Sequence, residues 1–222
     1  MLVKRLIEGA LIEDMPNGDI TTDHLLTDEP VVTYLLAKEK GVIAGIRYFK
    51  EVFLTLDNTI SFKEYVKDGD IVQKGQVILE IAGNIKSILK GERVALNILQ
   101  RMSGIATLTK KYVDKIKDTN VRIVDTRKTT PNFRFFEKEA VRLGGGYNHR
   151  YNLSDAVLIK DNHIAKVGSI KKAVALIRNN IPHTMKIEVE VEDLEMLKEA
   201  LEAGVDIIML DNMGTYMIKT AV

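Results

Sequence analysis

Charged side chains follow four apolar runs in the second half of this 222-residue sequence, and they mark where chemistry could occur. The runs cover residues 121–125, 156–160, 186–191 and 205–210. The charged residues at or just beyond their ends are Asp125, Arg127 and Lys128, then Lys160 and Asp161, then Glu188 and Glu190, and finally Asp211. If the runs are parallel strands, their carboxyl ends share one edge, where α/β barrels carry catalytic groups. The pattern therefore predicts a site built from both cations and carboxylates.

The run Ile187–Val191 alternates apolar residues with glutamate. Alternate side chains of a strand point to opposite faces, so Glu188 and Glu190 should share one face while the apolar face packs on helices. Inward carboxylates need a cation from a neighbouring strand or a metal ion, because an unpaired buried charge is very unfavourable. The alternative interpretation is an exposed edge strand with a solvated acidic face.

Residues 125–150 are locally basic, with six Lys or Arg against three Asp or Glu. Guanidinium groups suit carboxylates and phosphates. The triplet Gly144-Gly145-Gly146, just before His149 and Arg150, could let the main chain approach an anion or could simply form a turn. No Ser–His–Asp arrangement is legible, and a sequence without cysteine cannot use a thiol nucleophile. These residues predict an anion-binding α/β enzyme that uses a divalent metal.

The overall composition narrows the function classes further. A formal net charge of +1 provides no sequence-wide field for binding nucleic acid or an anionic membrane. No apolar run approaches the roughly 20 residues that span a bilayer. The absence of cysteine excludes disulfides and zinc–thiolate sites, and it favours a cytoplasmic location.

The elements that must position these residues follow two different patterns along the sequence, one before and one after a long helical segment. Up to Gly83, short β-like runs predict an antiparallel sheet, and they cover residues 31–37, 42–46, 60–66, 71–72 and 77–81. A first helix should pack against this sheet. Its apolar face consists of Leu2, Leu6, Ile7 and Leu11. Helical spacing over 92–117 predicts one or two long helices at the hinge between domains. Beyond it, helices expected at 134–142, 170–179 and 194–203 alternate with the four runs, which predicts parallel strands.

Several segments of the sequence resemble the quinolinate phosphoribosyltransferases, also called carboxylating nicotinate-nucleotide pyrophosphorylases. The segments are Gly91–Asn97, Ser103–Thr107, Asp125–Thr129, Gly144–Arg150, Leu158–His163 and Glu188–Val191, with Glu13-Asp14 and Gly18–Thr21 near the start. They run in the family's order and, with Asp211-Asn212, cover nearly the whole chain.

This resemblance implies an architecture of two domains. Residues 1–104 would form an N-terminal α/β sandwich domain with the hinge helix, and residues 105–222 a C-terminal α/β barrel of fewer than eight strands. The protein would be a homodimer or a larger homo-oligomer. Members of the family continue past the Asp-Asn pair with two further strand-and-loop units that hold phosphate. We therefore expect the barrel to be truncated after its fourth strand, which would put activity in doubt if 222 residues are the whole molecule.

The resemblance also implies a reaction and a set of site residues. A decarboxylating pentosyltransferase of this family uses Mg²⁺ to convert quinolinate and phosphoribosyl diphosphate into nicotinate mononucleotide, diphosphate and CO₂ in NAD biosynthesis. Carried over by position, the residues that would bind the pyridine dicarboxylate are Arg127, His149, Arg150 and Lys160. The catalytic residues would be Lys128, at the phosphorylated sugar, with Glu188 and Asp211, which would also hold the metal. Arg93 would reach the neighbouring subunit's site.

Three other interpretations stay open at this point. A paralogous phosphoribosyltransferase of the same fold could act on another substrate, although four retained cations favour a dicarboxylate over a monocarboxylate. Residues 66–77 resemble the turn-rich segment of biotinyl and lipoyl carriers, but without a recognisable lysine for modification. A truncated chain could also persist as a non-catalytic fragment.

Overall fold

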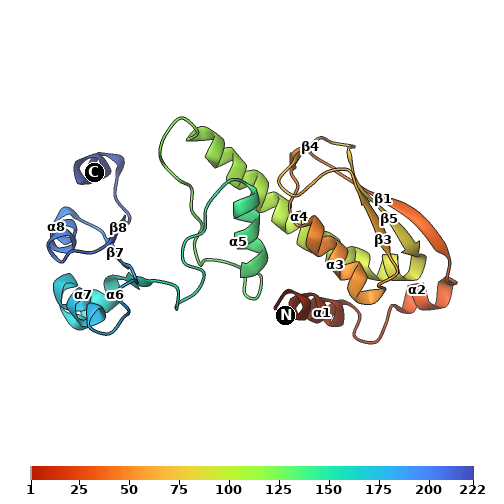
Figure 1. Cartoon of the computed structure of the whole chain (residues 1–222), viewed down its shortest axis with the longest axis horizontal. Coiled ribbons are helices and arrows are strands. Elements are labelled where there is room, and N and C mark those ends of the chain that lie inside the picture. The colour runs from red at the N-terminus through yellow and green to blue at the C-terminus, as the bar shows by residue number, and fades with distance from the viewer. Residues whose placement is uncertain (1) are drawn as a thin grey trace. The chain divides into compact units, whose positions relative to one another are not determined.

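The computed structural model describes residues 2–222 and divides the chain into two compact units (Figure 1). Unit 1 ends at His149, and unit 2 is Arg150–Val222. The elements of unit 1 are α1 (Leu2–Asp14), α2 (Ile20–Leu25), β1 (Pro30–Leu36), β2 (Gly41–Val42), α3 (Ile46–Leu56), β3 (Ser61–Glu64), β4 (Ile71–Val72), β5 (Val77–Asn84), α4 (Ile85–Lys115) and α5 (Arg134–Leu143).

The β-rich part of unit 1 is antiparallel, as predicted, but it forms two sheets rather than one. One sheet has the order β1-β5-β3, and β2 pairs with β4 in a second. The sequence predicted that the first helix packs on the sheet, and this prediction is wrong. The helix lies against α3 and α4, which bury Ile7 and Leu11 (Figure 1). The apolar face of α1 therefore covers helices instead of strands.

Helix α3 was not anticipated, because the signal that starts it is distant in the sequence. A strand was expected over 42–46, yet α3 begins at Ile46. The preceding Gly45 has φ +103°, a left-handed conformation that favours glycine. The main-chain N–H groups of Gly45 and Ile46 donate to the Asp68 carboxylate at 2.6 and 2.9 Å. A carboxylate 22 residues further along thus satisfies N–H groups that a local cap usually serves.

The expected long helix is a single 31-residue helix, α4, which begins seven residues earlier than predicted. Asn84 caps its start by accepting the Lys86 N–H at 2.8 Å. Within the helix, a Cβ at Gly91 would lie 2.7 Å from the Phe53 ring, so glycine permits close packing of α3 on α4. This helix belongs to unit 1 and forms much of its core.

Unit 2 contains the parallel sheet that the sequence predicted. Its elements are β6 (Val157–Ile159), α6 (Asp161–Val167), α7 (Ile170–Arg178), β7 (Ile187–Val191), α8 (Leu194–Glu202), β8 (Ile207–Leu210) and α9 (Thr215–Ala221). The strands have the order β6-β7-β8 and are parallel. Helices α7 and α8 lie side by side and bury the apolar face of β7 (Figure 1). Asp193 caps the start of α8 by accepting the Met196 N–H at 2.7 Å, and Gly204, just beyond its end, has φ +67°.

The first of the four predicted strands is not a strand in the described structure. Residues 121–125 contribute a single parallel bridge between Val124 and Tyr147. This segment belongs to unit 1, where it pairs with the chain that follows α5. Within residues 2–222, no helix combines the length and apolarity that crossing a bilayer requires.

Candidate active site

The predicted site residues fall in both units. In unit 2 they lie on one face of the parallel sheet. The register pairs Leu158 with Glu188 and Glu188 with Ile207. Paired residues of neighbouring strands point to the same face, and the direction alternates along each strand. Lys160, Glu188, Glu190 and Asp211 therefore share the face opposite the helices.

The strand β7 is central rather than an edge, so the alternative of a solvated acidic edge strand is wrong. Glu188 is buried, and the Glu190 side chain is only 15% exposed. Lys160 Nζ, at the end of β6, lies 2.5 Å from Glu190 Oε2. The expectation that a neighbouring strand supplies a cation to an inward glutamate is thus confirmed for Glu190. The Lys160 N–H is held as well, because it donates to His163 Nδ1 at 2.9 Å.

The register separates the two carboxylates that were expected to share a metal. Glu188 is level with Ile207, four residues before Asp211, a distance of about 13 Å along the strands. Glu190 is level with Met209, about 7 Å from Asp211 on the same scale. Glu190 is therefore a functional candidate as well, although the resemblance assigned it no role. Its signal was its place nearer the carboxyl end of the same strand.

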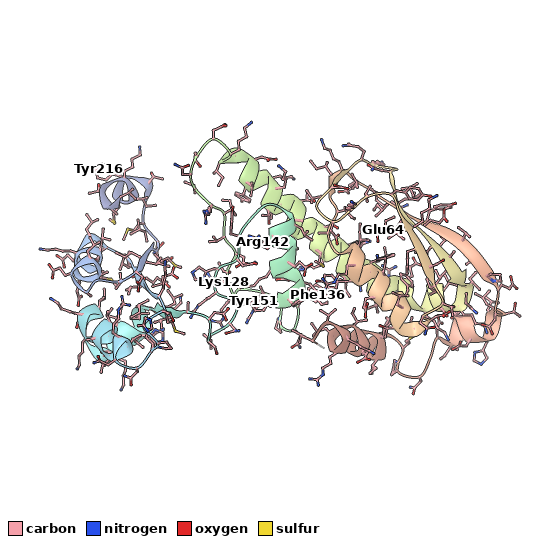
Figure 2. All side chains as sticks on the ribbon, in the orientation of Figure 1. Glu64, Lys128, Phe136, Arg142, Tyr151 and Tyr216 are labelled. Carbon is pink, nitrogen blue, oxygen red and sulfur yellow. The ribbon has the colours of Figure 1, made fainter. Side chains whose placement is uncertain are left out.

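In unit 1, the predicted cations Arg127 and Lys128 stand on the irregular segment that follows Asp125. Lys128 is exposed beside α5 (Figure 2), whereas Arg127 is half-buried. Arg127 Nε is buried and has no hydrogen-bond partner among residues 2–222. A buried N–H of a cation without a partner is costly. It is the kind of donor that a bound carboxylate would satisfy.

A hydrogen-bonded clamp fixes the end of this segment to two helices. Arg101 of α4 donates to Glu137 of α5 through Nε at 3.1 Å and Nη2 at 2.7 Å. The same Nη2 donates to Thr130 Oγ1 at 2.9 Å. Arg134 Nε also donates to Thr129 Oγ1, at 3.1 Å. Side chains from α4 and α5 thus replace the strand ladder that the segment lacks.

His149 is held by a buried ion pair. Lys138 of α5 forms this pair with Asp125, and the two side chains are 1% and 7% exposed. The His149 N–H donates to Asp125 Oδ1 at 2.9 Å, and Lys138 Nζ donates to the His149 carbonyl at 3.1 Å. Asn148 Nδ2 donates to Asp125 Oδ2 at 2.5 Å. The network joins the segment after residue 125 to the one that ends in His149.

Two glycines of the triplet pack closely against α4. A Cβ at Gly144 would lie 2.5 Å from the Ala106 carbonyl oxygen, and one at Gly146 would lie 2.9 Å from the Thr109 side chain. Both contacts are with α4. The triplet thus lets the chain after α5 run close against α4.

The last two predicted cations have few contacts in the described structure. Arg93 is exposed on α4. Arg150 begins unit 2 and donates from Nη1 to the Ala156 carbonyl at 3.4 Å.

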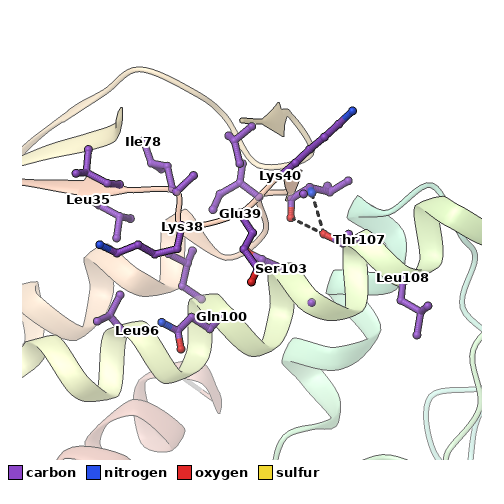
Figure 3. Close-up of a pocket in the computed structure, with 18 of the residues that line it drawn as sticks. Leu35, Lys38, Glu39, Lys40, Ile78, Leu96, Gln100, Ser103, Thr107 and Leu108 are labelled. Carbon is purple, nitrogen blue, oxygen red and sulfur yellow. Dashed lines mark hydrogen bonds between the residues drawn. The ribbon is translucent and has the colours of Figure 1, made fainter. Parts of the chain in front are cut away.

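A hollow of about 400 Å³ lies between α4 and the chain at 35–43 (Figure 3), and none of the predicted site residues lines it. Its polar wall is already hydrogen-bonded: Ser103 Oγ accepts the Ala44 N–H at 3.0 Å, and Thr107 Oγ1 accepts the Val42 N–H at 2.8 Å. A Cβ at Gly41 would lie 2.7 Å from Thr107 Oγ1. The segment Ser103–Thr107 therefore fastens β2 to α4, which gives this motif a structural role.

Two shifted pKa values belong to groups that support the site elements. Burial raises the pKa of the Tyr48 hydroxyl, and its hydrogen bond to Glu139 adds to the effect. That bond links α3 to α5. In unit 2, the Ile187 N–H that donates to Asp206 at 2.8 Å lowers the pKa of that carboxyl, with a further contribution from Arg178.

The oxygen donors of unit 2 suit a hard cation such as Mg²⁺. Magnesium is commonly held by one or two carboxylates together with substrate phosphates and water. Among residues 2–222, no group of three or more His, Asp or Glu is placed to hold a metal ion. Glu190 and Asp211, the nearer pair, thus fit a site that the substrate's diphosphate completes, and Glu188 lies further along the same face.

Family models and known proteins match the chain along its length. A model described as quinolinate phosphoribosyl transferase, N-terminal domain, matches residues 19–103, and the corresponding C-terminal domain model matches 105–222. A probable nicotinate-nucleotide pyrophosphorylase (carboxylating) of Synechocystis sp. is 49% identical over 222 residues, all of this chain and 75% of that protein. The protein so named in Bacillus subtilis is 46% identical over 210 residues, 95% of this chain and 73% of its own length.

Solved structures agree with these matches. The crystal structure of NadC from Streptococcus pyogenes aligns with a TM-score of 0.94 at 49% identity. It covers 99% of this chain, and the chain covers 78% of it. The mixed α/β fold of the chain is therefore that of NadC structures.

Proposed function

Because the chain belongs to the quinolinate phosphoribosyltransferase family, as its motifs indicated, we propose that it transfers a phosphoribosyl group to quinolinate. The donor is phosphoribosyl diphosphate, and the products are nicotinate mononucleotide, diphosphate and CO₂, for NAD biosynthesis. The observation that carries this proposal is the pair of family models that together match residues 19–103 and 105–222.

The reaction makes two bonds, one from nitrogen to carbon and one from carbon to hydrogen, and it breaks two. The ring nitrogen of quinolinate bonds to the anomeric carbon of the ribose while the bond from that carbon to diphosphate breaks. The bond between the ring and the adjacent carboxylate then breaks, and the electron pair left on the ring carbon takes up a proton. The first step develops positive charge on the ribose, and the second develops negative charge on the ring. Carboxylates and cations respectively favour these charges.

Four side chains are proposed to bind the two carboxylates of quinolinate: Arg127, His149, Arg150 and Lys160. The buried Arg127 Nε without a partner supports this assignment, since a charge-assisted hydrogen bond would satisfy it. Lys160 can also contribute. Its ammonium has three donors, of which the contact with Glu190 uses one.

The remaining polar residues are assigned to the sugar and the leaving group. Lys128, which is exposed, is placed at the phosphorylated sugar as a catalytic residue. Glu188 and Asp211 are proposed to hold Mg²⁺ and to stabilise the ribose, with Glu190 added because its register brings it closer to Asp211. When bound, Mg²⁺ neutralises charge on the departing diphosphate. The protein's part is to orient carboxylate oxygens toward it.

The finer architecture is part of the same proposal. An α/β sandwich domain with the hinge helix would span 1–104, supported by the antiparallel sheet with α3 and α4, and an α/β barrel would span 105–222, supported by the parallel strands of unit 2. The family models divide at the same place, ending at 103 and beginning at 105. Arg93, exposed on α4, would reach the neighbouring site in a homodimer in the cytoplasm.

The test is to incubate the purified chain with quinolinate, phosphoribosyl diphosphate and Mg²⁺ and to follow nicotinate mononucleotide by chromatography. Replacing quinolinate with nicotinate in a parallel reaction separates the proposal from a paralogue that takes a monocarboxylate. We expect product and equimolar CO₂ from quinolinate only. Product from nicotinate without CO₂ would assign the chain to the paralogous activity, and no product from either would indicate a non-catalytic chain.

A further inference from the structure

We propose that Lys138 and Asp125 are positioning residues that hold the main chain at His149 for quinolinate binding, an inference that rests on the proposed function. Neither residue belongs to the proposed substrate contacts. Both lie in unit 1 and are almost fully buried, with side chains 1% and 7% exposed.

The contacts of the pair converge on a single residue of the site. The His149 N–H donates to Asp125 Oδ1 at 2.9 Å, and its carbonyl accepts from Lys138 Nζ at 3.1 Å. Both polar main-chain groups of His149 are therefore bound by the two members of one ion pair. Irregular main chain needs such partners, because no strand ladder satisfies its N–H and C=O groups.

The Asp125 carboxylate also fixes the position of the neighbouring residue. Asn148 Nδ2 donates both to Asp125 Oδ2 at 2.5 Å and to the Lys138 carbonyl at 2.9 Å. Asp125 itself is tied to the opposite segment, since its N–H donates to the Tyr147 carbonyl at 3.1 Å. Three successive residues, 147–149, are thus bonded to Asp125, two positions before Arg127.

A purely stabilising role explains these charges poorly. Taking both ions out of water carries a large desolvation cost, and a well-packed apolar pair in such a place is often as stable or more so. An apolar pair could not bind the N–H and C=O of His149. The use of charge here is explained by the main-chain groups that it holds in place.

The test compares variants of the full chain in steady-state assays with quinolinate and phosphoribosyl diphosphate. We expect Asp125→Asn and Lys138→Gln each to raise the KM for quinolinate between about 10- and 100-fold, since small displacements of binding groups have effects of this size. The double variant should recover most of the loss, because it leaves no unpaired charge and its amides can still bond to each other and to His149. Asp125→Glu, which keeps the charge but lengthens the side chain, should raise the same KM while the protein stays folded.

A matched control is the exposed pair Lys110–Asp114 on α4 of the same unit. Lys110→Gln and Asp114→Asn should leave the KM for quinolinate unchanged. If the Asp125 and Lys138 variants lower the thermal midpoint but bind quinolinate with an unchanged KM, the positioning role is overturned. A raised KM that the double variant does not recover would also overturn it, by indicating a direct charge effect.

A second measurement separates this inference from the proposed function. Hydrogen exchange at the His149 amide, followed by NMR, should accelerate in Asp125→Asn relative to wild type whether or not the chain turns over quinolinate. If wild type is inactive but this acceleration occurs, the proposed function fails while the hold on His149 stands. Unchanged exchange would show that Asp125 does not hold the main chain there.

Discussion

The two units position polar side chains by different means. In unit 2, strand register alone determines which face and which level each residue occupies, so Lys160 meets Glu190 across neighbouring strands. In unit 1, Arg127 and His149 stand on irregular chain, and a set of side-chain bonds from α4 and α5 places them. A sheet face needs an alternating pattern and an apolar side. A loop needs several specific partners, each of which can be lost by a single substitution.

This difference predicts where substitutions will act. In unit 2, substitutions on the face that packs on the helices should lower the free energy of unfolding, whereas substitutions on the site face should lower activity. In unit 1, substitutions of residues that do not contact the substrate should lower activity as well, because these residues hold the irregular segments that contain Arg127 and His149.

The largest effect is expected from a charge on the apolar face of β7. Val189 is fully buried between the strands and the helices α7 and α8. Val189→Asp should reduce the free energy of unfolding by at least about 3 kcal/mol, because it buries a charge without a partner. Ile207→Lys is the control on the other face, at a residue that is 43% exposed and level with Glu188, and it should cost far less. Equal losses in thermal unfolding would refute the assignment of the two faces.

The next effect concerns the unit 1 cations. Arg127→Ala should lower kcat/KM for quinolinate about 100-fold, mainly through KM, because it removes charge-assisted bonds to a carboxylate. Lys117→Ala, an exposed substitution outside the segment that carries Arg127, is the control and should change little. Steady-state kinetics with quinolinate varied gives the answer. A normal KM in Arg127→Ala would remove this residue from the site.

A smaller effect is expected at the buried carboxylate of β7. Glu188→Ala should lower kcat about 10-fold with little change in the KM for quinolinate, because its charge favours the transition state more than the bound substrate. Glu192→Ala changes an exposed carboxylate just beyond the same strand and serves as control. Should Glu190→Ala lower kcat more than Glu188→Ala, Glu190 would be the carboxylate that acts on the ribose.

The sequence predicted unit 2 better than unit 1 for a physical reason. The alternation at Ile187–Val191 and the cap at Asp193 are local signals, and the structure confirms the strand, the helix after it and the parallel pairing. Helix α3 was missed because Asp68 caps its start from outside the local window. The strand expected at 121–125 did not form, because that segment bridges Tyr147 instead of joining the parallel sheet.

For the site, the types of residue were predictable from the sequence, but the side-chain contacts that hold them in place were not. The charged ends of the apolar runs led to Lys160 and Glu188 directly. Nothing in the local sequence indicates that Lys138 turns inward to meet Asp125, or that Gly144 faces Ala106, because these contacts join segments through α4 and α5. The resemblance to a family named the substrate contacts but not the side chains that hold them.

The smallest expected effect is a pH dependence within unit 2 at Asp206. The Ile187 N–H and Arg178 lower the pKa of this carboxyl in the folded state below its unfolded value of about 3.9. The ionised form therefore stabilises unit 2 above that unfolded pKa, and the contribution is lost as the pH falls through the lower folded value. Asp206→Asn should show a smaller fall in thermal midpoint between pH 5 and 3 than wild type, with Asp118→Asn as an exposed control. If the thermal midpoints of Asp206→Asn and wild type fall equally with pH, the charge of Asp206 does not stabilise unit 2.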